Sequence, residues 1–182
     1  MNLHLGIDPG SRDLGWALLS EDRSYFRSGT FCYKDHPHTG VGTQELFAIL
    51  DENIPEGAKI VSAALERYVP YSGKFTSNAE AICEIIGSIG MVLTQRRIKY
   101  LTVRAIDWKT LVVKMLFLLE RFTNPSDKLD KEFSIAAANH IIGGKHYKTN
   151  HEADGFGLAF YTLQLHSRKY KGYHEPKDSA RL

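Results

Sequence analysis

The sequence predicts an α/β fold: a mixed five-stranded sheet, with three antiparallel-connected strands followed by two parallel ones, flanked by helices. Three consecutive apolar segments, at residues 3–8, 13–20 and 25–33, have the length and composition of strands. Two further strand-like segments, at residues 59–66 and 99–104, are each followed by a helical pattern. Strands joined by short turns pair antiparallel, whereas a crossover through a helix gives parallel strands. The order of segments therefore predicts a mixed sheet with helices against its faces.

Local signals support each element in the first half of the chain. The short polar run Glu21-Asp22-Arg23-Ser24 suits a hairpin turn between the second and third strands. Residues 42–53 carry apolar residues at helical spacing, and Pro55-Glu56-Gly57 stops this helix. The fourth strand, at residues 59–66, reads Lys-Ile-Val-Ser-Ala-Ala-Leu-Glu and ends on a carboxylate. This half therefore predicts a hairpin, a helix and a strand that returns to the sheet.

The second half of the chain is mainly helical. Turn formers at residues 123–126 and at Gly143-Gly144 separate successive helical patterns. The predicted helices cover residues 76–96, about 106–120, about 127–142 and about 151–169. One strand, at residues 99–104, lies between the first two of these helices and completes the sheet.

Length and composition predict one compact domain. The chain has 182 residues, of which 43% are hydrophobic and 24% charged, as in ordinary globular proteins. We expect a single domain over residues 1–169 and a polar, basic tail over residues 170–182 that has few apolar residues to pack. No apolar run reaches the roughly 18 residues of a membrane span, and no secretory signal pattern is present. Two cysteines without a metal-ligand spacing fit a reducing cytoplasm, which is the expected location.

Charge is distributed unevenly along the chain. Residues 1–95 carry 7 Lys and Arg against 12 Asp and Glu, whereas residues 96–182 carry 16 against 9. A basic half indicates an anionic partner, of which nucleic acid is the commonest. A mixed, solvated surface with no such partner is the alternative that charge alone leaves open.

Acidic residues stand where two predicted strands end. Asp8 closes the first strand and Glu66 closes the fourth. A third acidic site is Asp154, which follows His151 by three residues at the head of the last helix, so that both lie on one helix face. Oxygen ligands of this kind suit Mg2+. Capping of the helix by Asn150, with acidic residues at its positive end, is the alternative for the helical pair.

The ordered motifs GIDPGSRDLGWALL (residues 6–19), ALERYVP (64–70) and NHEADGFGLAF (150–160) resemble the RuvC-type Holliday junction resolvases. The resemblance runs from residue 3 to about residue 165. It implies a ribonuclease H-like fold and a nuclease that resolves four-way DNA junctions. It also implies a metal site formed by four residues, Asp8, Glu66, His151 and Asp154.

Two divalent ions, Mg2+ with Mn2+ as a substitute, would supply the chemistry of phosphodiester hydrolysis. Asp8 would bridge both ions, while Glu66 and Asp154 would each help to hold one. His151 would either ligate an ion or orient the attacking water, and the sequence leaves both roles open.

The resemblance also implies positively charged and aromatic DNA contacts. Lys109 resembles a family lysine near the scissile phosphate, although a solvated lysine on a helix is the alternative. A second such lysine is Lys128 or Lys131, and the sequence does not choose between them. In the loop after Glu66, a tyrosine is expected to stack on a base, and the candidates are Tyr68 and Tyr71. Lys74, in the same loop, is the expected cationic contact.

Partners follow from the symmetry of the expected substrate. A four-way junction is two-fold symmetric, so paired nicks predict a homodimer. The helix at residues 76–96 offers an apolar face that is either this interface or one more core surface. Three alternatives to a junction resolvase stay open: a nuclease acting on other branched DNA or on RNA, a non-catalytic nucleic-acid-binding relative, and an actin-like ATPase or sugar kinase, which the short chain disfavours. Bacterial, phage and organellar origins are equally compatible with the sequence.

Overall fold

A computed structural model of the chain describes residues 1–33, 39–70, 78–120, 129, 131–144, 147 and 149–166. Its strands are β1 (Asn2–Asp8), β2 (Asp13–Ser20), β3 (Phe26–Cys32), β4 (Lys59–Glu66) and β5 (Lys99–Val103). Its helices are α1 (Thr39–Glu52), α2 (Ala79–Gln95), α3 (Ala105–Glu120), α4 (Lys131–Ile142) and α5 (Asn150–His166). The predicted order of elements is confirmed. The expected tail, residues 170–182, lies outside the described residues.

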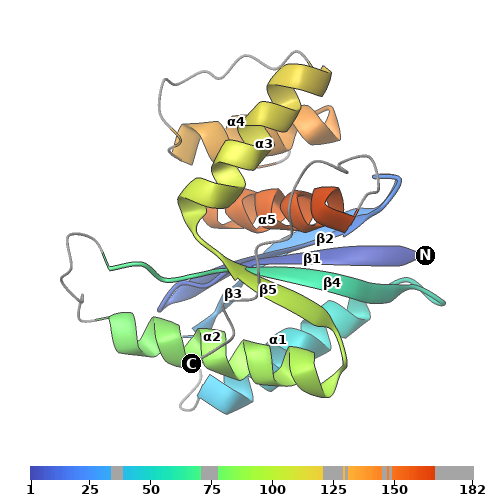
Figure 1. Cartoon of the computed structure of the whole chain (residues 1–182). Coiled ribbons are helices and arrows are strands. Elements are labelled where there is room, and N and C mark those ends of the chain that lie inside the picture. The colour runs from blue at the N-terminus through green and yellow to red at the C-terminus, as the bar shows by residue number, and fades with distance from the viewer. Residues whose placement is uncertain are drawn as a thin grey trace.

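The five strands form one mixed sheet in the order β3-β2-β1-β4-β5 (Figure 1). β1 pairs antiparallel with β2, and β2 pairs antiparallel with β3. β4 is parallel to β1 and to β5. The predicted fold class is therefore confirmed, with β1 at the centre and the C-terminal ends of β1 and β4 at the same edge.

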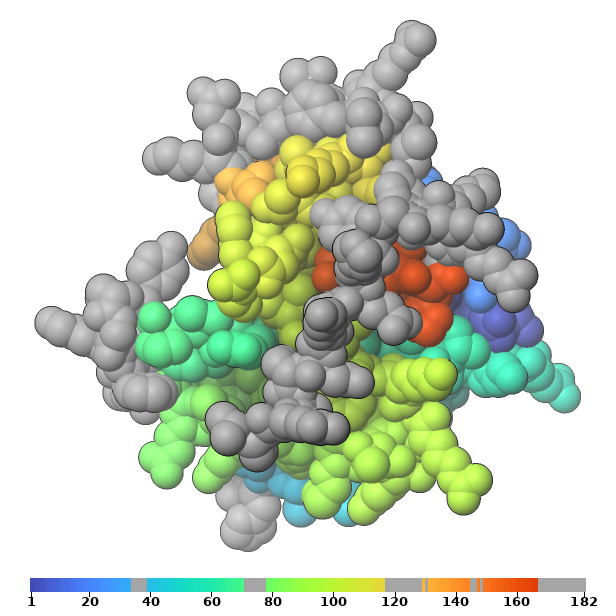
Figure 2. Space-filling view, in the orientation of Figure 1, coloured from blue at the N-terminus to red at the C-terminus, as the bar shows by residue number. Residues whose placement is uncertain are grey.

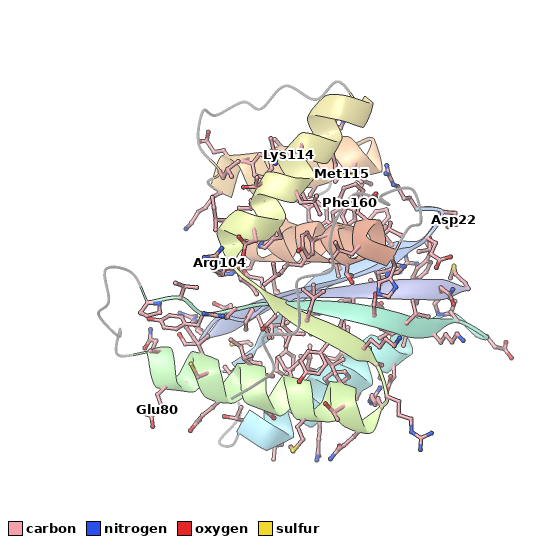
Figure 3. All side chains as sticks on the ribbon, in the orientation of Figure 1. Asp22, Glu80, Arg104, Lys114, Met115 and Phe160 are labelled. Carbon is pink, nitrogen blue, oxygen red and sulfur yellow. The ribbon has the colours of Figure 1, made fainter. Side chains whose placement is uncertain are left out.

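Helices cover both faces of the sheet, but not in equal layers. α1 and α2 lie against one face, and α5 lies directly on the other face (Figure 1). α3 and α4 contact α5 and form a second layer over it. Phe160 of α5 and Met115 of α3 belong to the buried cluster that joins these layers (Figure 3). α5 is therefore buried between the sheet and two helices.

Alternation along the central strands explains why one face accepts a helix so closely. Large apolar residues of β1 (Leu3, Leu5 and Ile7) enter the core under α1 and α2. The intervening positions are His4, Gly6 and Asp8, and these belong to the α5 face because neighbouring strand residues point to opposite sides. A hydrogen-bonded chain links the strands to the helix on that face: Thr162 of α5 donates to Ser62 of β4, which contacts the His4 ring.

Glycines allow the α5 backbone to touch the backbone of the sheet. A Cβ atom at Gly15 of β2 would overlap the carbonyl oxygen of His151, and one at Gly6 of β1 would overlap the Gly155 carbonyl oxygen and the Ala159 nitrogen. Any side chain at Gly6 or Gly15 would therefore displace α5. The first turn of α5, which carries His151, is held against β2 by this contact.

Two further properties concern the described part of the chain. None of the helices there combines the length and the apolar character that crossing a membrane requires. Cys32, at the end of β3, and Cys83, on α2, are both free thiols.

Substitution of Gly15 tests the close contact of α5 with the sheet. Gly15→Ala is expected to lower the free energy of unfolding by about 1–3 kcal/mol, because the added methyl group must displace the backbone at His151. Gly87→Ala on α2 is the control, since a Cβ there meets no other atom. It should raise stability by about 0.5–1 kcal/mol through helix propensity. Urea denaturation of both variants makes the comparison, and equal effects would contradict this packing.

Candidate functional site

Four of the predicted site residues come from three elements that meet at one edge of the sheet. Asp8 is the last residue of β1, and Glu66 is the last residue of β4. Because these neighbouring strands are parallel, both carboxylates emerge at the same edge. α5 begins at Asn150, so His151 and Asp154 lie in its first turns, above that edge. His151 hydrogen-bonds Asp8, and repulsion from Asp8 helps to raise the pKa of both Glu66 and Asp154, as expected for groups that stand at one edge.

Asp8 and His151 form the first close pair of the site. The His151 Nδ1 atom lies 2.8 Å from Oδ2 of Asp8, within hydrogen-bonding distance. Asp8 is buried, at 8% exposure, whereas the His151 side chain is partly open to solvent. The hydrogen bond to Asp8 raises the pKa of His151 above 6.5, against an opposing effect of burial. A protonated imidazole therefore balances the Asp8 charge over a wider pH range than an isolated histidine would.

Glu66 has the most strongly altered carboxyl group in the site. Burial, and then repulsion from Asp8, raise its pKa from 4.5 to about 7, with a smaller contribution from Asp154. The Trp108 indole opposes this shift by donating a hydrogen bond of 2.9 Å to Glu66 Oε2. Without a cation at the site, Glu66 is therefore half protonated near neutral pH.

Asp154 is a buried carboxylate with an incompletely satisfied oxygen. Burial is the main reason that its pKa is raised. The Lys109 ammonium lies 3.3 Å from Asp154 Oδ1, and Ser134 of α4 also hydrogen-bonds the carboxylate. Apart from that ammonium, Oδ1 has no hydrogen-bond partner in the described part of the structure. An oxygen of this kind is available to a cation.

The residues present fit a divalent cation in chemistry more closely than in arrangement. Three carboxylates repel one another across a partly buried edge, and such repulsion is relieved when a cation binds. Within the described ranges, however, no three histidine, cysteine or acidic side chains are gathered as a metal-binding group. Asp8 instead pairs with His151, and Asp154 pairs with Lys109. Binding an ion would therefore require these pairs to open or to share their oxygens.

The predicted DNA contacts are only partly described. Lys109, on α3, lies inside the site, and its side chain is only 11% exposed. Lys131 is the exposed first residue of α4, one helical turn before Ser134. Tyr68 is half-buried, two residues after Glu66. Three other predicted contacts lie outside the described residues: Tyr71, Lys74 and Lys128.

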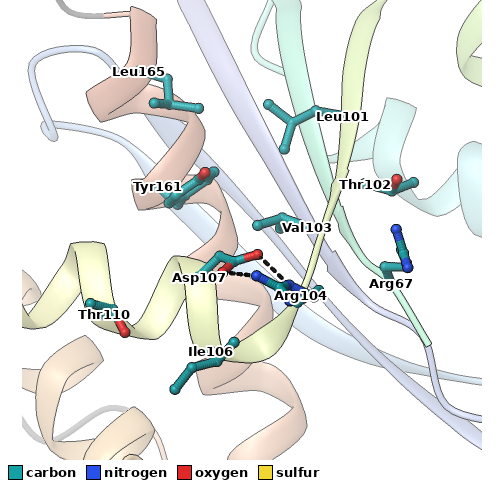
Figure 4. A pocket seen from close by; sticks show the side chains of 10 residues that line it. All are labelled: Arg67, Leu101, Thr102, Val103, Arg104, Ile106, Asp107, Thr110, Tyr161 and Leu165. Atoms are coloured by element: carbon teal, nitrogen blue, oxygen red, sulfur yellow. Dashed lines mark hydrogen bonds and ion pairs between the residues drawn. The ribbon is translucent and has the colours of Figure 1, made fainter. Parts of the chain in front are cut away.

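A groove adjoins the Glu66 side of the site. It has a volume of about 430 Å3 and is bordered by the residue after Glu66, by β5, by the start of α3 and by the second half of α5. Figure 2 shows α3 and α5 as adjoining parts of one surface, and Figure 4 shows the groove between them. Its walls are mainly apolar, with Arg67 and an Arg104–Asp107 ion pair of 2.7 Å at one end (Figure 4). Both guanidinium groups lie at the end of the groove nearest Glu66, because Arg67 follows Glu66 and Arg104 follows Val103, the β5 partner of Glu66.

The sequence reasoning missed two residues that support the carboxylates. Trp108 contacts Glu66, and Ser134 contacts Asp154. Ser134 lies in a helix with no recognisable motif, so no sequence signal identifies it. Trp108 precedes Lys109 directly, but neighbouring helix residues point about 100° apart, and only the fold reveals that both reach the same site.

The pKa of Glu66 predicts how stability depends on pH in the metal-free protein. Because the folded pKa is about 7 and the ordinary value is 4.5, the folded state keeps a proton that the unfolded state has lost. The free energy of unfolding should therefore fall as pH rises from about 4.5 to about 7, by up to about 3 kcal/mol. Glu66→Gln, which stays neutral, should show a shallower fall.

The measurement is urea denaturation in EDTA between pH 5 and pH 8. Glu56→Gln, in an exposed turn, is the matched control and should keep the wild-type pH dependence. If Glu66→Gln follows the same curve as the wild-type protein, the altered carboxyl group is not Glu66.

Comparison with known proteins gives a fold but no sequence relative. No protein-family model and no curated protein sequence matches the chain. Among solved structures, Thermus thermophilus RuvC in complex with a Holliday junction substrate matches with a TM-score of 0.67 and 14% identity, over 91% of this chain and 95% of that one. A second Thermus thermophilus RuvC structure matches with a TM-score of 0.60 and 15% identity, over 90% and 95%.

The yeast mitochondrial Holliday junction resolvase matches with a TM-score of 0.53 and 11% identity, over 93% of this chain and 82% of that one. At such low identities, a match over nearly the whole length establishes architecture rather than activity. The predicted resemblance is therefore confirmed at the level of structure: the protein has the ribonuclease H-like fold of the RuvC-type resolvases.

Proposed function

We propose that the protein is a divalent-metal-dependent endodeoxyribonuclease that resolves four-way DNA junctions by paired, symmetric nicks. The observation that carries the proposal is the meeting of Asp8, Glu66, His151 and Asp154 at one sheet edge. Among the solved structures with this fold, the yeast mitochondrial protein is a Holliday junction resolvase by name, and one RuvC structure was determined in complex with a Holliday junction substrate. The shared architecture and the carboxylates at one sheet edge together favour nucleic-acid hydrolysis.

The proposed chemistry assigns a role to each side chain. Asp8, Glu66 and Asp154 would hold Mg2+ or Mn2+, two ions in each site, and the ions would activate water and stabilise the charge on the phosphate. His151, which already contacts Asp8, would either ligate an ion or orient the attacking water. Lys109, which now pairs with Asp154, would contact a phosphate oxygen if ions took its place at that carboxylate.

The surface around the site supports a nucleic-acid substrate. Arg67 and Arg104 border the groove beside Glu66, and Lys131 stands exposed at the start of α4. Cations placed in this way bind the phosphate backbone without reading sequence. Tyr68, or Tyr71 in the part of the loop that is not described, is the proposed stacking residue, with Lys74, Lys128 and Lys131 as further DNA contacts. These features favour a nuclease that acts on recombining DNA in the cytoplasm.

A homodimer is part of the proposal, because two symmetric nicks require two sites. The structure narrows the surface that α2 can offer to a second copy. Ile85 and Ile89 face the core, so they are not available to a partner. Met91, at 57% exposure, and Val41 of α1, at 51%, remain outside it. A hollow of about 320 Å3 between α1 and α2, which Met91 borders, completes the proposed face.

Cleavage of a synthetic four-way junction tests the proposed function. With Mg2+ or Mn2+, the wild-type protein should make paired nicks on the junction and leave a matched linear duplex intact. Asp154→Asn should reduce cleavage at least 100-fold, because it removes a charge that the ions require. Glu56→Gln, in an exposed turn away from the site, is the control and should cut normally.

The other outcomes separate the alternatives. Cleavage should stop in EDTA. Binding of the junction without any cleavage would favour a non-catalytic relative, whereas equal cutting of other branched DNA or of RNA would favour a broader nuclease. If the protein neither binds nor cuts the junction, the proposed function is overturned, whereas the fold is unaffected.

A further inference from the structure

Trp108 occupies an unusual position for a core residue. Its ring is 1% exposed and lies against α5, where a Cβ atom at Gly157 would overlap it. Its Nε1 atom, however, reaches the edge of the sheet and donates a hydrogen bond of 2.9 Å to Glu66 Oε2. The indole therefore connects the packed interior of α3 and α5 to one carboxylate of the proposed metal site.

The chemistry of the indole makes this contact directional. An indole N–H can only donate, and a buried one needs an acceptor. Because the ring is fixed by packing on α5, its N–H direction is fixed as well. One oxygen of Glu66 is thereby held, while repulsion from Asp8 and Asp154 acts on the same carboxylate.

The next residue on α3 acts on a different carboxylate. Lys109 lies 3.3 Å from Asp154, and its ammonium is 5.0 Å from the centre of the Trp108 ring. Two consecutive residues of α3 thus contact side chains that come from β4 and from α5. Through these two residues, α3 contacts the carboxylates of both Glu66 and Asp154.

We propose that Trp108 is a positioning residue, whose indole N–H orients Glu66 for binding a divalent cation. This inference rests on the proposed function, because it concerns the same site. A hydrogen bond from a residue behind a ligand typically strengthens metal binding 10- to 100-fold. Loss of the N–H alone should therefore weaken cation binding even where the ring is replaced by another aromatic group.

The first test observes the hydrogen bond directly and uses no DNA. The chain has two tryptophans, so a protein labelled with 15N at the indole should give two N–H signals. Trp16→Phe removes one of them and assigns the other to Trp108. Glu66→Ala should shift the Trp108 signal upfield, and Mg2+ should shift it in the wild-type protein. An unmoved Trp108 signal in either experiment would overturn the proposal.

The second test measures the affinity for Mn2+, by paramagnetic resonance of the free ion. Trp108→Phe should bind Mn2+ 10- to 100-fold more weakly than the wild-type protein. Trp16→Phe, which removes the other buried indole, should bind it within about two-fold. In a Glu66→Ala background, Trp108→Phe should cause no further loss, because the two residues act together. Additive losses, or wild-type affinity in Trp108→Phe, would show a merely structural tryptophan.

The outcomes distinguish this inference from the proposed function. If the wild-type protein cuts junctions but Trp108→Phe binds Mn2+ normally, only the role of Trp108 fails. If Mn2+ binding depends on Trp108 and Glu66 while no junction is cut, only the proposed function fails. Should Trp108→Phe not fold, the shift of the Trp108 signal in Glu66→Ala still decides the question.

Discussion

The contact of the α5 backbone with β1 and β2 is the constraint on which the rest of the structure depends. Gly6 and Gly15 remove the side chains that would separate helix from sheet, and the carbonyl groups of His151 and Gly155 occupy the vacated space. This contact fixes the height of the first turn of α5 above the strand ends. His151 can then reach Asp8, and Asp154 can reach Lys109. A helix held one side chain further away would leave the four site residues apart.

The same burial that brings the carboxylates together makes them unstable as ions. Burial raises the pKa of both Glu66 and Asp154, and repulsion from Asp8 adds to each effect. His151 and Lys109 offset part of this cost by supplying positive charge. Repulsion of this kind is common at functional sites, where a ligand relieves it. Here the unrelieved charge is negative, so the ligand that would relieve it is a cation.

The carboxylates at the strand ends were predictable from the sequence, whereas the residues that hydrogen-bond the site carboxylates were not. Asp8 and Glu66 follow strands that are recognisable from their apolar runs, and parallel strands must end at one edge. The face that Asp8 and Glu66 share with α5 follows from the alternation of β1 and β4, but only once the partner helix is known. Trp108 and Ser134 contact residues far away in the chain, and such contacts depend on tertiary packing that no local pattern encodes. Likewise, the sequence pattern does not show whether Ile85 and Ile89 belong to an interface or to the core, and the fold places them in the core.

The central claim is that a binding site for divalent cations forms where β1, β4 and α5 meet. Its most direct test is a crystal of the protein grown with Mn2+, with anomalous diffraction used to locate the ion. We predict a peak among the carboxylates of Asp8, Glu66 and Asp154, with the Lys109 ammonium displaced from Asp154. A well-ordered site with no peak there, or with Mn2+ bound only at other residues, would contradict the claim.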